Sequence, residues 1–426
     1  MQILLVGSGA REDALAWKLT QSPLCDKLFI APGNAGCERW GSLVPLKDTQ
    51  IAELLNFATD NRIDLTIVGP EAPLAEGIVD TFTEAGQKIF GPTARAALIE
   101  SSKSFARNLM RKHNIPSAEF KEFQSPEAAI EHLKTCIFPR VIKADGLAAG
   151  KGVSVVKNID EAVQAVEMMM VDRKFGAAGT RILTEEFLQG QEASLLAFTD
   201  GSTILALPTA QDHKPVYDND EGPNTGGMGS YCPAPLVNTE IYSRIENRIL
   251  VPVIHGLAKA ERPFSGVMYC GLMIAHNEPK VVEFNCRFGD PEIQSLIVKL
   301  QSDLLEIILA TVAAKLEDMH GKVAWDPRPA VSVVLASGGY PESYKKGYEI
   351  SGLEDVYAMD DVFIFHAGTT KRDQQVLTNG GRVLTVTAMA EDLPTAKARA
   401  YEAVEKISFH GMHYRKDIAD KALKML

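Results

Sequence analysis

The first hundred residues alternate between short apolar runs and amphipathic stretches. Stretches with apolar residues at helical spacing separate apolar runs that are long enough for short strands. This alternation predicts a parallel sheet built from βα units. The expected strands are Ile3–Val6, Leu28–Ile30, Leu65–Val68 and Lys88–Phe90, and the expected helices are Ala14–Leu19, Ile51–Ala58 and Leu74–Phe82.

A turn of small residues follows each predicted strand; the turns read GSG at 7–9, APGN at 31–34, GPE at 69–71 and GPT at 91–93. Ligands of parallel α/β sheets collect at the carboxyl ends of the strands, where backbone N–H groups of such turns can bind an anion. We therefore expect a pocket at this edge. A dinucleotide site is disfavoured, because Glu12 replaces the third glycine of the fingerprint and no acid follows the second strand.

A glycine-rich segment predicts a phosphate-binding turn. Residues 140–152 read RVIKADGLAAGKG, so Lys143 stands near the end of a strand and glycines follow it. Glycine turns expose N–H donors to phosphate oxygens, and a lysine adds a point charge. The spacing differs from that of a P-loop, and a surface hairpin with a solvated lysine is the alternative. Upstream, Lys103 lies on a predicted helix, and residues 108–125 are expected to connect two units.

Two later segments combine apolar and polar residues in ways that suit a binding site. Ile182–Glu192 predicts a strand that runs into a turn, where backbone groups could receive an adenine ring and Glu192 could bind ribose hydroxyls; solvated acids would give the same pattern. In LPTAQDHK, residues 207–214, Asp212, His213 and Lys214 together resemble site chemistry, although a lone histidine is more often a hydrogen-bonded spectator. The glycine-rich stretch 218–231 predicts a lid or binding loop, with disorder as the alternative.

The segment Val281–Glu292, VVEFNCRFGDPE, carries a candidate metal site. Side chains two apart on a strand share a face, so Glu283, Asn285 and Arg287 point one way while the apolar neighbours point the other. A carboxylate beside an amide oxygen suits Mg²⁺, which takes one or two protein ligands and completes its shell with water and nucleotide phosphates. A polar strand face with a surface salt bridge is the alternative.

The remaining pattern predicts a hairpin and a third unit. Residues 266–274 and 281–285 are expected to pair, and an apolar helical pattern runs from Ile293 to Lys315. The third unit begins near Ala330. Its expected strands are Val331–Leu335, Val362–His366 and Arg382–Val386, and its expected helix is Leu393–Ile407.

Composition restricts the partners and the compartment. A chain of 426 residues is too long for one core, which favours two to four domains. A formal charge of −11 without a basic block disfavours nucleic acid and anionic membranes as partners. Six cysteines without a C-x-x-C pair predict reduced thiols and a cytoplasmic location. The N-terminal apolar run breaks into glycine at once, as a first strand does and an export signal does not.

Collinear stretches along the chain read PGNAG at 32–36, VGPEAPL at 68–74, IKADGLAAGKGV at 142–153, AQDHK at 210–214, GPNTGGMG at 222–229, EFNCRFGDPE at 283–292, ASGGYP at 336–341 and GGRVLTVT at 380–387. Together they resemble the phosphoribosylamine–glycine ligase family of the ATP-grasp superfamily nearly from end to end.

The resemblance implies a multidomain protein of the α/β and α+β classes. Its expected parts are an N-terminal parallel α/β pre-ATP-grasp domain at 1–102, a two-lobed ATP-grasp region at 103–328 and a C-terminal antiparallel β domain with a helix at 329–426. The smaller lobe, about 122–192, would cover the nucleotide. The implied reaction of purine biosynthesis joins glycine to 5-phosphoribosylamine through a glycyl phosphate, while ATP becomes ADP and phosphate. The implied partners are these small molecules, without nucleic acid, membrane or an obligatory protein.

The resemblance also assigns roles to single positions. Glu283 and Asn285 are the implied ligands of Mg²⁺ or Mn²⁺. The implied ATP contacts are Lys103, Lys143, Gly146, Gly150, Lys151, Gly152, Glu185, Glu186, Phe187, Leu188 and Glu192. The implied substrate contacts are Gly9, Asn34, Gly36, Glu71, Asp212, Lys214, Gly226, Gly227 and Arg287. Among all of these, Arg287, Lys143 and Asp212 are the expected catalytic residues.

Two positions depart from the family pattern, and three other functions compete with it. Asp13 stands where the family usually has histidine, and Pro215 follows Lys214 where it usually has arginine. One competitor is another ATP-grasp carboxylate ligase, such as a formate-using glycinamide ribonucleotide transformylase or a biotin-dependent carboxylase subunit. The others are a nucleotide-binding regulatory module without turnover and a dehydrogenase.

Overall fold

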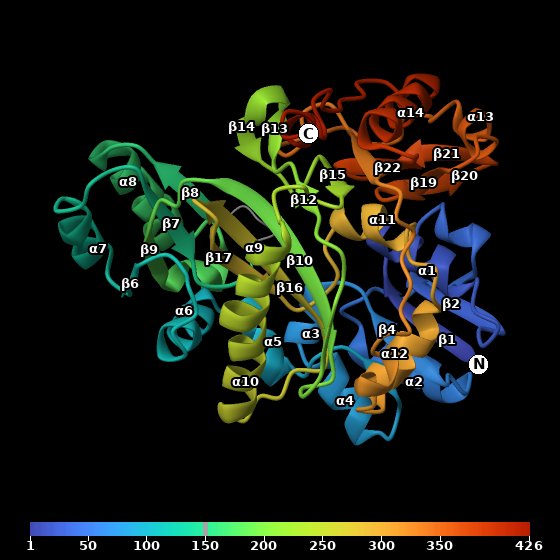
Figure 1. The fold of residues 1–426 in the computed structure, drawn as a ribbon, viewed down its shortest axis with the longest axis horizontal. Helices are drawn as coiled ribbons and strands as arrows, with labels where there is room; N and C mark the ends of the chain where they lie inside the picture. The colour runs from blue at the N-terminus through green and yellow to red at the C-terminus, as the bar shows by residue number, and fades with distance from the viewer. Residues whose placement is uncertain (148–151) are drawn as a thin grey trace.

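The computed structural model describes residues 1–147 and 152–426 (Figure 1). A blue N-terminal α/β part and a red C-terminal part lie on one side of the view, and a smaller lobe with α7 and α8 lies on the other. The long strands β10 (Gln191–Thr199), β16 (Gly266–Ala275) and β17 (Glu278–Asn285) run between them.

The N-terminal part is the parallel sheet that the sequence predicts. Its strand order is β3-β2-β1-β4-β5, and every pairing is parallel. Ile3–Val6 are fully buried because helices cover both faces of this sheet. The strands are β1 (Gln2–Gly7), β2 (Lys27–Pro32), β3 (Ser42–Leu43), β4 (Leu65–Val68) and β5 (Ile89–Phe90); the helices are α1 (Ala10–Leu19), α2 (Ile51–Asp60), α3 (Glu71–Ala75), α4 (Ile78–Glu84) and α5 (Ala94–Ser101).

The smaller lobe is an antiparallel sheet with its own core. The strand order is β6-β9-β7-β8, and Leu133, Ile142 and Val166 belong to the apolar cluster that it shares with two helices. The strands are β6 (Phe120–Phe123), β7 (Arg140–Ala144), β8 (Val153–Val156) and β9 (Ile182–Glu186), and the helices are α7 (Pro126–Leu133) and α8 (Ile159–Val166), which a π-turn at 167–171 extends. Helix α6 (Lys103–Lys112) leads into this lobe.

The central sheet has the order β11-β10-β16-β17, and its buried residues share two apolar clusters with the N-terminal sheet. Its edge strand is β11 (Ile204–Ala206). Helix α9 (Thr239–Ile245) contacts β17 and helix α12 (Leu304–Val312) contacts β16, while α10 (Val251–Lys259) packs on α6 and α11 (Glu292–Ile297) packs on α1. The expected hairpin is confirmed: Tyr269 pairs with Asn285, and the strands turn at His276 and Asn277.

The C-terminal sheet has the order β12-β15-β18-β22-β19. Two of its strands, β12 (Gln211–Asp212) and β15 (Gly229–Cys232), come from the middle of the chain. The residues after 329 therefore form only part of this sheet. The others are β18 (Ala330–Ala336), β19 (Val362–His366) and β22 (Arg382–Met389); β13 (Pro215–Tyr217) pairs with β14 (Glu221–Asn224), and β20 (Thr369–Arg372) with β21 (Gln375–Thr378). The helices are α13 (Leu353–Tyr357), α14 (Leu393–Lys406) and α15 (Asp420–Leu423).

Four of the expected element boundaries are wrong. The single helix expected at 74–82 is divided at Gly77, whose φ of +88° no helix accepts. The apolar pattern of 293–315 forms two helices, α11 and α12, instead of one. Residues 108–125 are more than a connection, since α6 runs to Lys112 and β6 follows. The strand in 281–292 already begins at Glu278 and ends at Asn285.

The stretch 218–231 is also more ordered than its composition predicts. It contributes β14 to a hairpin and β15 to the C-terminal sheet, where Tyr231 is fully buried. The described helices include none with the length and apolar character that crossing a membrane requires.

Candidate active site

The strand β17 divides its polar and apolar residues as the sequence predicts. Phe284, Cys286 and Phe288 are almost completely buried, whereas Glu283, Asn285 and Arg287 are only partly covered. Their side chains therefore reach an accessible face while the strand remains anchored in the core. The carboxylate and the amide stand two residues apart on that face, as a shared metal site requires.

Glu283 is held in its charged form by its neighbours. Lys214 Nζ lies 3.6 Å from Glu283 Oε1 and 3.1 Å from Glu192 Oε2. Burial opposes ionisation of Glu283, but Lys214, Lys143 and Lys103 outweigh it and lower its pKa to about 2. Burial likewise opposes the charge on Lys214, and Glu192 with Glu283 raises the pKa of Lys214 well above its usual value.

The donor set around Glu283 suits a metal ion that is shared with a nucleotide. The residues that the structure describes include no group of three or more His, Cys, Asp or Glu side chains arranged around one point. An ionised Glu283 and the amide of Asn285 supply one or two oxygen ligands, which is the number that Mg²⁺ takes when phosphates and water complete its shell. These residues fit the metal that the sequence implies.

Lys143 and Glu185 form a buried ion pair in the smaller lobe, where this lobe contacts β17. Lys143 Nζ lies 2.9 Å from Glu185 Oε2 and donates to Val282 O at 3.3 Å. Arg107 on α6 donates to both oxygens of Glu185, at 2.6 and 2.7 Å, and to Val282 O at 2.8 Å. Burial raises the pKa of Glu185, but Lys143 and Arg107 outweigh it and lower the pKa below its usual value. This network ties the smaller lobe to the strand of the proposed metal ligands.

Lys103 holds the beginning of the glycine-rich segment. Its Nζ donates to Gly146 O at 2.9 Å, and Ser104 N donates to Asp145 Oδ1 at 3.1 Å. Gly152 directly precedes β8, so the segment connects the paired strands β7 and β8. Gly150 and Lys151 lie outside the described residues.

The segment expected to receive adenine, Glu185–Leu188, spans the end of β9 and the two residues after it. Glu186 pairs with Arg140 and donates its N–H to Glu119 O, while its carboxylate lies 2.9 Å from Lys280 Nζ. Phe187 and Leu188 come directly after it, and Phe187 is 39% exposed. Glu192 then stands at the start of β10, beside Lys214.

Arg287 bridges the N-terminal part and β17. Its Nε lies 3.2 Å from Glu71 Oε2, and its Nη2 lies 3.5 Å from Glu100 Oε1. Burial raises the pKa of Glu71, but Arg287 and Arg11 outweigh it and lower the pKa to about 2. Cys286 N donates to Glu100 Oε2 at 2.7 Å, so this acid also fixes the backbone of the turn. The arginine is therefore oriented on two sides.

The predicted substrate contacts Asn34 and Gly36 lie in a buried junction with the C-terminal part. Asn34 Nδ2 donates to Ser8 O at 2.9 Å and to His366 O at 2.7 Å, and Asn34 Oδ1 accepts from Gly36 N at 2.8 Å. A Cβ at Gly36 would lie 2.5 Å from the His366 ring. In this conformation both residues hold the N-terminal loops together.

Asp13, one of the two positions that depart from the expected pattern, is held by three hydrogen bonds. Its carboxylate accepts from His366 N at 2.7 Å, from Trp40 Nε1 at 2.8 Å and from Arg39 Nη2 at 3.1 Å. Burial raises the pKa of Asp13, and Arg39 partly offsets the effect. Asp13 thus joins the N-terminal part to β19 instead of opening toward a ligand.

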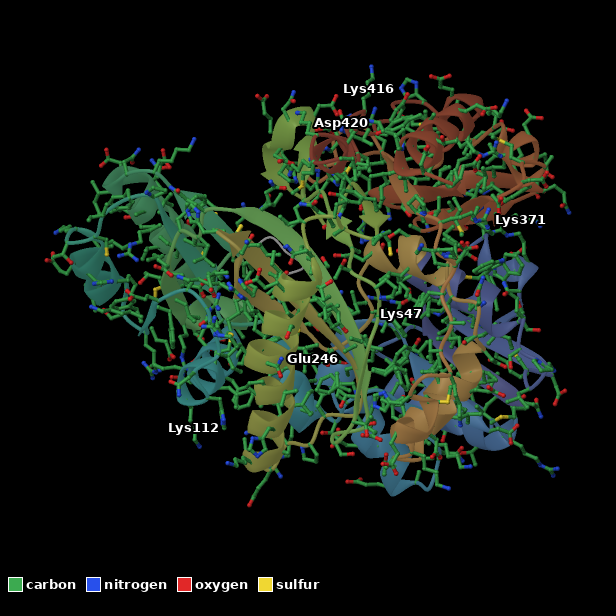
Figure 2. The ribbon with its side chains drawn as sticks, viewed as in Figure 1. Lys47, Lys112, Glu246, Lys371, Lys416 and Asp420 are labelled. Atoms are coloured by element: carbon green, nitrogen blue, oxygen red, sulfur yellow. The ribbon has the colours of Figure 1, made fainter. Side chains whose placement is uncertain are left out.

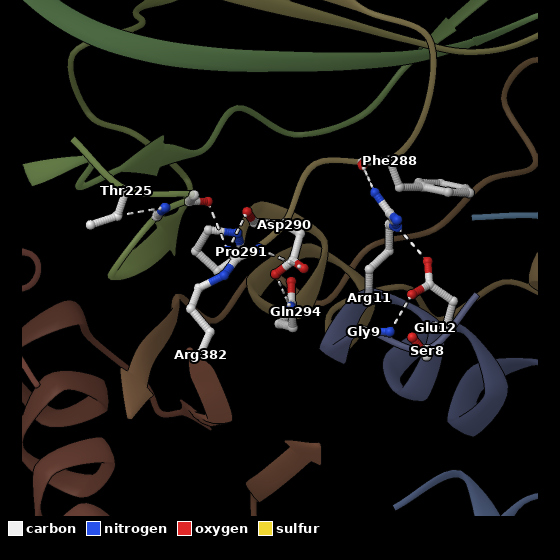
Figure 3. Close-up of polar contacts among 12 residues, drawn as sticks. Ser8, Gly9, Arg11, Glu12, Thr225, Phe288, Asp290, Pro291, Gln294 and Arg382 are labelled. Carbon is white, nitrogen blue, oxygen red and sulfur yellow. Dashed lines mark hydrogen bonds and ion pairs between the residues drawn. The ribbon is translucent and has the colours of Figure 1, made fainter. Parts of the chain in front are cut away.

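A second junction holds the glycine-rich stretch 222–229 (Figure 3). Arg382 donates to Gly226 O at 2.7 Å and to Asp290 O at 2.8 Å, and its Nη2 lies 3.1 Å from Asp290 Oδ2. Gly226 N donates to the Tyr340 hydroxyl at 3.0 Å. The turn at 288–291 also contacts the N-terminal part, because Arg11 donates to Phe288 O (Figure 3). Next to Arg11, Gly9 N donates to Glu12 Oε2. The turn at 288–291 therefore lies between N-terminal and C-terminal contacts.

Asp212 lies under Gly227 in a buried acidic environment. Its Oδ1 accepts from His213 N at 2.6 Å and would lie 2.8 Å from a Cβ at Gly227. Burial, with Glu292 adding to it, raises the pKa of Asp212 well above its usual value. Ser194 and Tyr269 both donate to Glu292 Oε1, at 3.0 and 2.8 Å.

Pro215, the other departing position, accepts a hydrogen bond from a buried arginine through its carbonyl oxygen. Arg415 Nη1 donates to Pro215 O at 3.1 Å and lies 3.0 Å from Asp220 Oδ1, while Arg415 Nη2 lies 2.7 Å from Asp417 Oδ2. The side chain of Arg415 is completely buried. The C-terminal part thus places a buried cation behind β13.

Sequence reasoning missed several residues that position the site. Arg107 and Glu100 lie on helices whose patterns show only amphipathicity, so no signal pointed to them. Glu292 and Arg382 fall within matched stretches, EFNCRFGDPE and GGRVLTVT, and could have been found there. The local sequence pattern identifies none of these four residues, because each contacts residues that are distant in sequence.

These features together define an ATP-grasp enzyme, with two lobes around an acid–amide pair and several lysine and arginine side chains close to it. The sequence matches the domain models described as phosphoribosylglycinamide synthetase N domain at 1–100, ATP-grasp (A) domain at 101–293 and C domain at 330–421. The chain belongs to the phosphoribosylamine–glycine ligase family.

Individual relatives agree with this assignment. The chain is 49% identical to a phosphoribosylamine–glycine ligase of Rhodopirellula baltica, over 99% of this chain and 98% of the relative. The crystal structure of phosphoribosylamine–glycine ligase from Thermotoga maritima superposes with a TM-score of 0.85 at 31% identity, covering 98% of this chain and 100% of that one. Biotin carboxylase of Campylobacter jejuni, at 15% identity, shares the fold with a TM-score of 0.75, covering 97% of this chain and 92% of that one.

Proposed function

We propose that this protein joins glycine to 5-phosphoribosylamine, giving glycinamide ribonucleotide while ATP is converted to ADP and phosphate. The observation that carries the proposal is the convergence of Glu283, Lys214 and Arg287 at the end of β17, where the N-terminal loops meet the ATP-grasp lobes. This arrangement occurs in a chain that shares its whole length with members of the family.

The chemistry needs an activated carboxyl group, because the glycine carboxylate is a poor electrophile. The γ-phosphoryl group of ATP moves to a glycine carboxylate oxygen, giving ADP and glycyl phosphate. The amine of phosphoribosylamine then attacks the glycyl carbonyl, loses a proton, and expels phosphate as the amide bond forms. Alignment of the reactants can be worth roughly 7–11 kcal/mol in steps of this kind.

The smaller lobe and its hinge would bind ATP. Lys143 and Lys103 would neutralise phosphate oxygens, and the segment from Gly146 to Gly152, including Gly150 and Lys151, would fold over them. Backbone groups at Glu185–Leu188 would receive the adenine ring, and Glu192 would accept from ribose hydroxyls. The buried ion pair between Glu185 and Lys143 supports this assignment, because it presets the lysine at the end of β7.

Glu283 and Asn285 would hold Mg²⁺ or Mn²⁺ through their oxygens. A divalent ion held there would supply positive charge against the charge that develops during phosphoryl transfer. The low pKa of Glu283, about 2, supports the role, because the carboxylate needs no deprotonation at neutral pH.

Arg287, Lys214 and Asp212 would act on glycine and phosphoribosylamine. Arg287 would supply a fixed positive charge to the carboxylate or its phosphate, since Glu71 and Glu100 hold its guanidinium in place. The turn at Gly226 and Gly227 and the loops with Gly9, Asn34, Gly36 and Glu71 would enclose the substrates and exclude water from the glycyl phosphate. In this assignment Asn34 and Gly36 act by fixing the loops.

We also propose three functional units, 1–102, 103–328 and 329–426, and a cytoplasmic location. The N-terminal sheet and the separate core of the smaller lobe support the first two units. Strands β12 and β15 pair within the C-terminal sheet, so the proposed second and third units share that sheet. Six unpaired cysteines support a reducing compartment.

Substrate omission tests the proposed function. ADP release from purified protein is measured with ATP and Mg²⁺, leaving out glycine or phosphoribosylamine in turn. Rapid ADP release is expected only with both. Release that depends on formate or on bicarbonate and biotin would identify another carboxylate ligase, and nucleotide binding without release would identify a regulatory module.

A further inference from the structure

The last residues of the chain line a cavity of about 580 Å³ beside the proposed nucleotide site. Glu192 and Met273 line it from β10 and β16, where they are paired in register. Lys214 borders the cavity as well. The facing wall comes from the C-terminus, with Lys421, Lys424 and Met425.

The C-terminal wall is fixed to the fold on two sides. Lys421 Nζ lies 2.5 Å from Asp220 Oδ2 on the turn between β13 and β14, and Asp420 forms an ion pair with Lys397 on α14. Ala422 is completely buried. The C-terminus accordingly lies beside β13 and β14 (Figure 1), and Asp420 lies at the edge of the red C-terminal part (Figure 2). These anchors place the final residues at the cavity instead of leaving them as a free tail.

The charges around the cavity leave one lysine without a carboxylate. Lys214 is paired with Glu192, and Lys421 with Asp220. Lys424 has no ion pair within residues 1–147 and 152–426. An exposed ammonium group next to the 46% exposed Met425 combines a hydrogen-bond donor with an adaptable apolar side chain. This combination suits a nucleoside, which offers ribose oxygens and an aromatic base.

We propose that Lys424 and Met425 form part of the ATP site, with the ammonium group donating to a ribose oxygen and the thioether packing against the nucleoside. The assignment rests on the proposed function only in taking Glu192 as the residue that binds ribose. It makes nucleotide affinity depend on the C-terminal part, although the ATP-grasp lobes hold the phosphates.

Two variants test the inference by nucleotide binding alone. Lys424→Ala removes the donor, and a chain that ends at Leu423 removes the donor and Met425 while keeping α15 and its anchors. The dissociation constant of ADP with Mg²⁺ is measured by isothermal titration calorimetry. We expect it to rise roughly 3- to 10-fold in Lys424→Ala, and further in the shortened chain. The KM for ATP should rise in parallel, with kcat and the KM for glycine within about twofold of the unmodified protein.

Lys416→Ala is the matched control, since it removes the same charge from an exposed position of the same segment that borders a different groove, next to α14 (Figure 2). It should leave ADP affinity unchanged. The inference is overturned if the shortened chain melts at the normal temperature and binds ADP as tightly as the unmodified protein. Because ADP binding needs neither glycine nor phosphoribosylamine, this outcome stays separate from a failure of the ligation assay.

Discussion

At the scale of single residues, the site depends on cations that carboxylates hold in place. Lys214 lies between Glu192 and Glu283, and Arg287 between Glu71 and Glu100. Lys214 lowers the pKa of Glu283 and Arg287 lowers the pKa of Glu71, and each acid fixes the direction of a cationic side chain that would otherwise move freely. Preorganised charge of this kind costs no reorganisation when a phosphoryl group is transferred.

Glu283→Gln should lose most of its turnover through weakened metal binding. The substitution keeps the shape of the side chain but removes the negative charge that a divalent cation requires. We expect kcat at 1 mM Mg²⁺ to fall by about 100-fold or more, on the order of 3 kcal/mol, with partial recovery as Mg²⁺ increases. The measurement is the rate of ADP formation over a Mg²⁺ titration.

Glu278→Gln is the control for this prediction, because it makes the same change at the start of β17, where Glu278 pairs with surface arginines Arg244 and Arg248. Its Mg²⁺ titration should match that of the unmodified protein. Normal turnover of Glu283→Gln at limiting Mg²⁺ would contradict the metal assignment.

At the scale of elements, the polar stretch 222–229 is ordered by what surrounds it. Arg382 and Tyr340 hold Gly226, and Gly227 approaches Pro291 and Asp212 so closely that only a hydrogen fits. The turn that was predicted as a lid is thus fastened to the C-terminal sheet. This stretch has a single large apolar side chain, the buried Met228, and it acquires the rest of its order from hydrogen bonds to neighbours that lie far away in the sequence.

Gly227→Ala should impair substrate binding more than ATP binding. A Cβ at this position would lie 2.3 Å from Pro291 Cδ and 2.8 Å from Asp212 Oδ1, and φ is +112°. The turn must shift away from Asp212, so we expect the KM for phosphoribosylamine to rise at least ~10-fold while the dissociation constant of ADP changes little. Steady-state kinetics and calorimetry measure the two effects.

Gly86→Ala separates backbone strain from this steric effect. Gly86 has φ of +76°, but a Cβ there meets nothing within 4 Å. It should cost about 1–2 kcal/mol of stability without altering KM. Equal effects of both substitutions on KM would show that the Gly227 turn has no role at the substrate.

At the scale of the whole molecule, the C-terminal part is joined to the rest by buried polar contacts. His366 offers its backbone N–H to Asp13 and its carbonyl to Asn34, and its ring contacts Tyr357 and Thr369. Burial, with Arg39 adding to it, lowers the pKa of His366 to about 3. Burial, with Arg415 and Lys421 adding to it, also lowers the pKa of His213 to about 3, against the weaker effects of Asp220 and Asp417.

These two histidines predict a loss of stability in mild acid. The unfolded chain binds a proton near pH 6.5, whereas the folded chain does so only near pH 3, so stability falls as pH drops through this window. Each histidine should cost about 2–3 kcal/mol between pH 7 and pH 4.5. Urea unfolding at several pH values measures the slope.

His366→Gln should reduce that slope, whatever it does to stability at pH 7. The exposed His320 provides the matched control, and His320→Gln should retain the slope of the unmodified protein. A slope that His366→Gln and His213→Gln together leave unchanged would contradict the prediction.

Much of the architecture could be predicted because its causes are local. The period of apolar residues identified β1, β4 and β19 closely, and the alternation along 281–288 separated the buried face from the polar face. The helix expected at 74–82 failed because one glycine with a left-handed backbone outweighs an apolar pattern. The candidate site residues were placed by resemblance, and their roles stay proposals.

The sequence by itself determined the βα order of the N-terminal part, the acid–amide pair on one strand face and the membership of the family, since each depends on residues close together or on motifs in collinear order. Only the tertiary structure decided that Arg107 holds Glu185, that Arg382 holds the Gly226 turn and that the C-terminus lines a cavity together with Glu192 and Lys214. The physical reason is that the partners of these side chains stand 78, 156 or more positions away in the sequence, and only folding brings them together.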